Sequence, residues 1–132
     1  SAVETVTSKI RSTLDAAALC KMADRGQIKG GLLDGPLAFD NAISKAAAKT
    51  KGIVSVVAGD VDILLAPDLE SGNMLAKQLS FLANADSAGL VLGARVPVVL
   101  TSRADSVRAR LASAGVAVRL AHARRTGGGK SS

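Results

Sequence analysis

Short apolar runs alternate with segments of helical periodicity along this chain, and this alternation constrains the fold more than any other feature. The apolar runs are residues 28–33, 53–58, 61–66, 90–92 and 96–100, and the helical segments are 4–25, 38–51, 72–84 and 105–123. Such an order is typical of an α/β fold and predicts a layered α/β/α domain with a mostly parallel sheet. We expect run 61–66, ended by Pro67, to be a strand covered on both faces, whereas run 53–58 fits a strand or an extended loop.

Helix boundaries are marked by residues with known capping preferences. Gly26 and Gly52 follow helical segments and are expected to stop them. Asp68 or Ser71 is expected to cap the helix over 72–84. The 132 residues suit one compact domain, placed at 1–124, and residues 125–132 are expected to form a flexible basic tail.

Composition limits the classes of partner. The formal net charge is +6, which favours anionic partners. Binding of single-stranded nucleic acid usually needs aromatic stacking platforms, and the chain has two Phe and no Trp or Tyr, so no nucleic-acid partner is expected. A nucleotide-like cofactor or a phosphate fits the charge equally well. No apolar run approaches the roughly 20 residues that span a bilayer, so no membrane partner is expected either.

Cysteine and histidine usage points away from metal chemistry. Cys20 and His122 are the single members of their kinds, which leaves no spacing typical of a metal site. The simplest interpretation of Cys20 is a small buried apolar residue rather than a nucleophile. A single cysteine fits the reducing cytoplasm best.

Three sequence motifs stand out. The segment PVVLTSRADS, residues 97–106, reads as a strand, a turn and a helix start, with Ser102 and Arg103 at the junction. Free helix-start N–H groups and an arginine together favour a phosphate or carboxylate ligand. The other motifs are LLDGPLAFDNAIS at 32–44 and GDVDILLAPDLESGNMLAKQL at 59–79. Taken one at a time, each is more simply explained as a turn or a capped helix.

Taken together and in this order, the three motifs resemble the phosphate acetyltransferase/phosphate butyryltransferase family, and the butyryltransferase branch most. The resemblance runs from about residue 18 to about residue 118 and covers only the second, C-terminal half of family members. It implies one lobe of the two-lobed isocitrate/isopropylmalate dehydrogenase-like fold. It also implies that an N-terminal lobe, which forms part of the cleft, lies outside this chain.

The resemblance further implies a reaction: acyl-CoA and inorganic phosphate give acyl phosphate and CoA, with no cofactor or metal. The family's Ser-Arg pair aligns with Ser102 and Arg103, so these are the expected catalytic and substrate-binding residues. Arg103 would bind the phosphate, and Ser102 would hydrogen-bond a carbonyl or phosphate oxygen. Asn73 is expected to line the same cleft as a substrate-binding residue.

Two questions stay open at this level. The chain could instead be a non-catalytic domain that retains the fold for assembly or for binding CoA or phosphate. The acyl chain could be acetyl, propionyl or butyryl. Because a lobe on its own exposes surface that normally packs, a homodimer is expected in either case.

Overall fold

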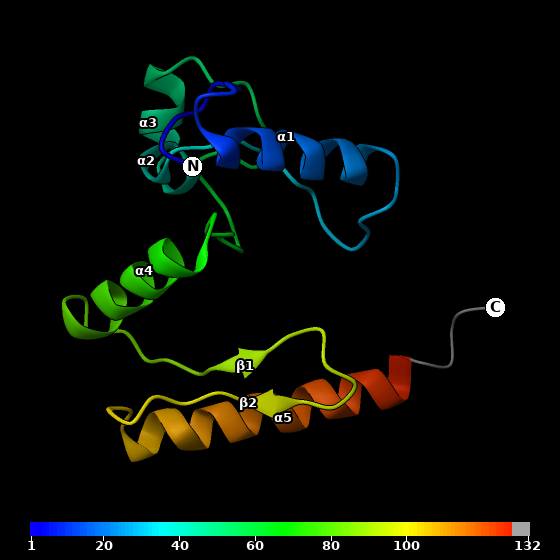
Figure 1. The fold of residues 1–132 in the computed structure, drawn as a ribbon, viewed down its shortest axis with the longest axis vertical. Coiled ribbons are helices and arrows are strands. Elements are labelled where there is room, and N and C mark those ends of the chain that lie inside the picture. The colour runs from blue at the N-terminus through cyan, green and yellow to red at the C-terminus, as the bar shows by residue number, and fades with distance from the viewer. Residues whose placement is uncertain (128–132) are drawn as a thin grey trace. The chain divides into compact units, whose positions relative to one another are not determined.

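The computed structural model describes residues 1–127, which form two compact units, Ser1–Met74 and Leu75 onward (Figure 1). Each unit is described below by itself. The first contains α1 (Arg11–Asp24), α2 (Phe39–Ile43) and α3 (Lys45–Thr50). Helix α4 (Leu69–Phe81) includes the boundary, and the second unit continues with β1 (Leu90–Val91), β2 (Val98–Val99) and α5 (Val107–Gly127).

Both predicted glycine stops are confirmed in the first unit. Gly26 and Gly52 have φ of 71° and 67°, a left-handed conformation that glycine adopts without steric cost. After α1, Gly26 N–H donates to Ala23 O and Gln27 N–H donates to Met22 O, both at 2.9 Å. This pair of bonds is the Schellman motif, which satisfies carbonyls that the helix end leaves free. The same motif ends α3.

The helix expected over 38–51 is two helices, because the chain is extended at Ser44. Ser44 has φ −128° and ψ 113°, and its hydroxyl accepts a hydrogen bond from Ala47 N–H at 3.2 Å. The serine therefore serves as the N-cap of α3 instead of continuing α2. The helix expected from residue 4 likewise begins only at Arg11, since the hydroxyl of Thr13 bonds the backbone of Thr7.

The interior of the first unit is polar as well as apolar. Thr13 and Asn41 are fully buried, beside the small apolar residues Ala38, Ala42 and Ala48. Asn41 Nδ2 donates to Glu4 Oε2 at 3.3 Å, and Lys51 Nζ lies 3.4 Å from the same carboxylate oxygen. Hydrogen bonds thus join the segment before α1 to α2 and to the residue after α3.

In the second unit, a β-hairpin packs against helix α5. Strands β1 and β2 are antiparallel, with Leu90 opposite Val99 and Val91 opposite Val98. Ser113, on α5, is buried; its hydroxyl accepts from Gly89 N–H at 3.0 Å and donates to Ala109 O at 2.7 Å. This hydroxyl attaches the start of β1 to the helix.

The described residues combine helices and strands, but they do not show the layered α/β/α arrangement with a mostly parallel sheet that the sequence predicts. Their only sheet is the two-stranded antiparallel hairpin, and runs 28–33, 53–58 and 61–66 form no strand. Parallel strands need non-local partners, whereas a hairpin forms between neighbours in the chain. In run 61–66, Ile63 and Leu65 are 84% and 75% exposed, so the segment lacks the cover that a central strand requires.

Two further expectations concern the chain's extent. Residues 125–127, assigned to a basic tail, continue α5, and residues 128–132 lie outside the described residues. The single domain at 1–124 stays a prediction. Within residues 1–127, no helix combines the length and the hydropathy needed to cross a membrane.

The close approach at Gly89 generates a stability prediction. A Cβ on Gly89 would overlap Leu100 O, while a Cβ on Gly115, within α5, would meet nothing within 4 Å. We expect Gly89→Ala to destabilise the fold by about 1–3 kcal/mol, because backbone atoms must shift. Gly115→Ala should stabilise it by up to about 1 kcal/mol, since alanine is the better helix former.

Urea unfolding followed by circular dichroism measures both variants. Equal midpoints for Gly89→Ala and the parent chain would contradict this packing of β1 against the chain that follows β2.

Candidate functional site

The residues predicted to bind substrate in the second unit lie in a tight turn, Ser102–Asp105, directly before α5. Ser102 N–H donates to Asp105 Oδ2 at 2.6 Å, and Asp105 N–H donates to Ser102 O at 3.1 Å. Ser102 Oγ accepts a longer hydrogen bond, 3.4 Å, from Ala104 N–H. The Asp105 carboxylate thus closes the turn, and Ser102 contributes its amide, carbonyl and hydroxyl.

Helix α5 begins two residues later than the sequence predicts, at Val107 instead of Asp105. Ser106 is the effective N-cap, because its hydroxyl accepts from Ala109 N–H at 3.1 Å. Asp105 is engaged with Ser102 and belongs to the turn. The turn therefore lies at the positive end of a 21-residue helix, where anions are stabilised.

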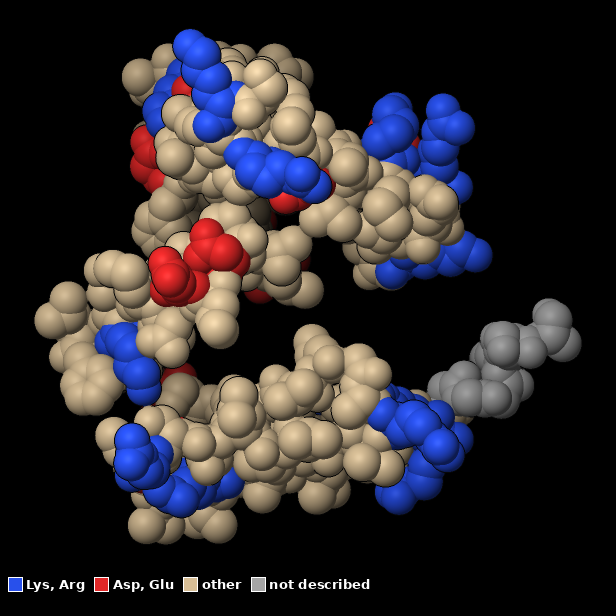
Figure 2. Space-filling view, viewed as in Figure 1, with Lys and Arg blue, Asp and Glu red and all other residues tan. Residues whose placement is uncertain are grey.

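Three arginines lie in the turn or in the first residues of α5, and their guanidinium groups have different contacts. Arg108 Nη2 lies 2.6 Å from Asp86 Oδ2 and forms an ion pair. Arg110 donates to backbone carbonyls of the turn. The exposed side chain of Arg103 has no hydrogen-bond or ion-pair partner among residues 1–127. Figure 2 shows that basic side chains gather towards the two ends of α5, and Arg103 is the one near the helix start whose fork is available to a ligand.

Arg110 is the residue that sequence reasoning missed. Its Nη2 donates to Ser102 O at 3.2 Å and to Arg103 O at 3.4 Å, and its Nε donates to Asp105 O at 3.3 Å. The acceptors precede Arg110 by five to eight residues, a spacing with no recognised sequence signature. On the sequence alone, it is one more solvated helix arginine.

Asn73, the third predicted site residue, is exposed on α4 in the first unit. Ser102 and Arg103 belong to the second unit, so the structure brings these two together, and a shared cleft with Asn73 stays a prediction. Asn73 lies in α4, and the start of that helix is fixed by a cap. Asp68 precedes α4, and its Oδ1 accepts from Ser71 N–H at 2.8 Å and from Ser71 Oγ at 2.7 Å, so Asp68 is the predicted cap.

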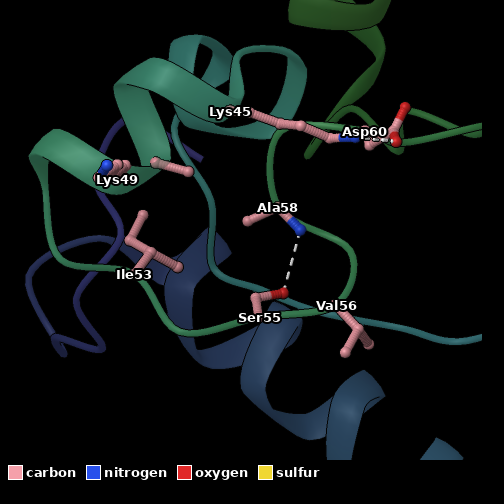
Figure 3. Close-up of a pocket in the computed structure, with 8 residues that line it drawn as sticks. Lys45, Lys49, Ile53, Ser55, Val56, Ala58 and Asp60 are labelled. Carbon is pink, nitrogen blue, oxygen red and sulfur yellow. Dashed lines mark hydrogen bonds and ion pairs between the residues drawn. The ribbon is translucent and has the colours of Figure 1, made fainter.

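A separate hollow of about 320 Å³ lies in the first unit, beside α3 (Figure 3). Lys45 and Lys49 border it, Ile53 contributes an apolar wall, and the Ser55 hydroxyl accepts from Ala58 N–H at 3.0 Å. Lys45 is already paired with Asp60 at 2.5 Å, which neutralises half of the positive charge there. This hollow contains none of the predicted site residues.

Cys20 has the character of a packing residue. Burial raises the pKa of its thiol above the usual value, and Sγ lies 3.6 Å from Gly35 O. A raised pKa keeps the thiol protonated at neutral pH, which disfavours nucleophilic chemistry. Among residues 1–127, no three His, Cys, Asp or Glu side chains gather as a metal site would require; the expected absence of a metal or cofactor stays a prediction.

Comparison with known proteins gives one consistent family. Residues 1–118 match the family described as "Phosphate acetyl/butaryl transferase". The chain is similar to the phosphate acetyltransferase of Rhizobium meliloti, with 72% identity over 95% of this chain and 40% of that protein. It is 49% identical to the phosphate butyryltransferase of Clostridium beijerinckii over 90% of this chain and 39% of that protein. These identities do not support the closer resemblance to the butyryltransferase branch that the motifs suggested.

A solved structure agrees with the sequence comparisons. The crystal structure of a branched-chain phosphotransacylase from Enterococcus faecalis V583 matches with a TM-score of 0.78 and 35% identity, over 92% of this chain and 44% of that one. The chain therefore spans about two fifths of the length of the proteins compared here.

The cap of α4 generates a pH-dependent prediction. Hydrogen bonds from the Ser71 backbone and hydroxyl hold the pKa of Asp68 below its usual value. A lowered folded-state pKa means that the stabilisation is complete above the unfolded-state pKa, about 3.9, and is lost as the pH falls through the folded value. We expect Asp68→Ala to lower Tm by about 2–4 °C at pH 7 and by less near pH 2.

Thermal melts at both pH values measure this difference. Asp62→Ala removes an exposed carboxylate that has no bonded partner among residues 1–127, and it should leave Tm unchanged. A Tm loss for Asp68→Ala that is as large at pH 2 as at pH 7 would show that the carboxylate charge is irrelevant to the cap.

Proposed function

Because the chain belongs to the Phosphate acetyl/butaryl transferase family, we propose that it forms the phosphate-binding part of an enzyme that transfers an acyl group between CoA and inorganic phosphate. The observation that supports this most directly is the available guanidinium of Arg103 beside the hydroxyl of Ser102, at the positive end of α5. An arginine fork, a hydroxyl donor and a helix start suit a tetrahedral oxyanion.

The proposed chemistry assigns one task to each residue. A phosphate oxygen attacks the thioester carbonyl, the carbon–sulfur bond breaks, and the CoA thiolate leaves and takes up a proton. Arg103 binds two phosphate oxygens and reduces the repulsion between the phosphate and the electron-rich carbonyl. Ser102 donates its hydroxyl hydrogen to a phosphate or carbonyl oxygen, where negative charge increases in the transition state. The substrate-binding role expected of Asn73 stays a prediction.

The proposal includes a larger fold than the described one. In it, residues 1–124 act as the second lobe, and run 61–66 is a strand of a mostly parallel α/β/α sheet whose neighbours come from outside this chain. The exposed side chains of Ile63 and Leu65 support this, since burying two such side chains is worth about 3–6 kcal/mol. A first lobe supplies the remaining wall of the cleft. The cytoplasmic location and the absence of membrane and nucleic-acid partners stay predictions.

We also propose that the chain forms a homodimer. Along α5, the side chains of Val107, Leu111 and Val118 are 73%, 68% and 67% exposed. Contiguous exposed apolar side chains on one helix face are typical of an interaction surface. A second copy related by a two-fold axis is the simplest cover for it.

Thiol release tests the catalytic proposal. Acetyl-CoA and butyryl-CoA are incubated with the chain, with and without inorganic phosphate, and free CoA is titrated. We expect phosphate-dependent release, reduced about 100-fold or more by Arg103→Ala because charge stabilisation in the transition state is lost. Comparing the two thioesters gives the acyl preference.

Arg95→Ala is the matched control, since it removes an exposed arginine that has no bonded partner among residues 1–127; this variant should keep full activity. Should the chain alone release no thiol, titration of inorganic phosphate followed by ³¹P NMR tests the same residue. Phosphate binding that Arg103→Ala leaves unchanged would refute the assignment of Arg103, and binding without turnover in any condition would favour the non-catalytic alternative.

Sedimentation velocity at about 50 μM tests the dimer. We expect a dimer for the parent chain and a monomer for Leu111→Glu, because a buried unpaired carboxylate costs more than the contact it replaces. Val54→Glu introduces the same charge at a fully exposed residue outside α5 and should leave the dimer intact. A parent chain that sediments as a monomer would contradict the proposal.

A further inference from the structure

We propose that Arg110 is a positioning residue, which holds the Ser102–Asp105 turn in the conformation that presents Ser102 and Arg103 to a phosphate or acyl phosphate. This inference rests on the proposed function and extends it to a residue outside the Ser-Arg pair. Its basis is the set of hydrogen bonds from one guanidinium to three carbonyls of the turn.

The contacts of Arg110 are concentrated on the turn. Its Nη2 donates to Ser102 O and Arg103 O at 3.2 and 3.4 Å, and its Nε donates to Asp105 O at 3.3 Å. A guanidinium has five N–H donors in a rigid plane, so it can hold several acceptors in a fixed relation. Arg110 is itself held in α5, where its amide donates to Ser106 O at 3.1 Å. The first turn of α5 is thus hydrogen-bonded to the segment that precedes it.

Fixing these carbonyls also fixes the neighbouring amides. In a trans peptide, the carbonyl of one residue and the N–H of the next point in opposite directions. With Ser102 O and Arg103 O directed at Arg110, the amides of Arg103 and Ala104 point away from it. Ala104 N–H indeed points to Ser102 Oγ, at 3.4 Å. The amide of Arg103 has no bonded partner among residues 1–127, which leaves it available as a third donor beside the Arg103 fork and the Ser102 hydroxyl.

Charge alone does not explain Arg110. Arg108 lies on the same helix turn and has the same formal charge, but it is paired with Asp86 at 2.6 Å and makes no bond to residues 102–105. The two arginines therefore differ in their partners, which are Asp86 for Arg108 and the carbonyls of the turn for Arg110. Without Arg110, the Arg103 carbonyl would have no bonded partner among the described residues, and the Ser102 carbonyl would keep only its hydrogen bond from Asp105 N–H.

The pair of arginines provides a matched experiment on the chain as it stands. Arg110→Met and Arg108→Met each remove one positive charge near the start of α5. Binding of inorganic phosphate is titrated by ³¹P NMR, and amide hydrogen exchange is measured at residues 102–105. We expect Arg110→Met to weaken phosphate binding about 10-fold or more and to speed exchange at Ala104 and Asp105, while Arg108→Met changes both only slightly.

Two more variants separate the possible failures. Arg110→Lys keeps the charge and a hydrogen-bond donor, so it should bind phosphate more tightly than Arg110→Met. If circular dichroism shows that Arg110→Met does not fold, Arg110→Gln replaces it, because glutamine keeps a donor without the charge. Equal weakening by Arg110→Met and Arg108→Met, with unchanged exchange in the turn, would overturn the positioning role. If Arg103→Ala leaves phosphate binding intact too, the proposed function also fails. If Arg103→Ala abolishes phosphate binding while Arg110→Met behaves like Arg108→Met, the proposed function stands and only the role of Arg110 is refuted.

Discussion

The hydroxyl of Ser113 is the contact on which the second unit depends. It accepts from Gly89 N–H and donates to Ala109 O, and it is buried between β1 and α5. A two-stranded hairpin is only marginally stable in water by itself. Gly89, which Ser113 holds, also accepts a hydrogen bond from Leu100 N–H at 3.0 Å, so the same residue fixes the chain that leads from β2 to the turn at Ser102.

The first unit is built on a different principle. Its fully buried side chains are Thr13 and Asn41, whose hydrogen bonds join segments that small alanines alone would hold weakly. Lys51 extends this network, and its ammonium group holds the pKa of Asp40 below the usual value. Large apolar side chains meanwhile remain exposed, among them those of the 61–66 run. A core of this kind is small, which agrees with a chain that spans about two fifths of the length of its relatives.

At the candidate site, three arginines of equal charge have three different environments. Arg108 neutralises Asp86, Arg110 binds the carbonyls of the turn, and Arg103 faces solvent. Guanidinium groups that are already bonded within the protein have less to offer an incoming anion than one that is not. The distribution of partners, and not the total charge of +6, is what distinguishes a candidate ligand residue from its neighbours.

The sequence by itself determined the local features and the family. Glycine at positions 26 and 52 ends helices because only glycine adopts the left-handed conformation at little cost, and Asp68 caps α4 because its carboxylate accepts a hydrogen bond from Ser71 N–H. The family followed from three motifs in order. Tertiary structure alone decided that runs 90–92 and 96–100 pair antiparallel and that Arg110 contacts the turn before α5. Those outcomes depend on which groups come into contact in the folded chain. Apolar periodicity in the sequence indicates which residues are buried, but it does not indicate which element packs against them.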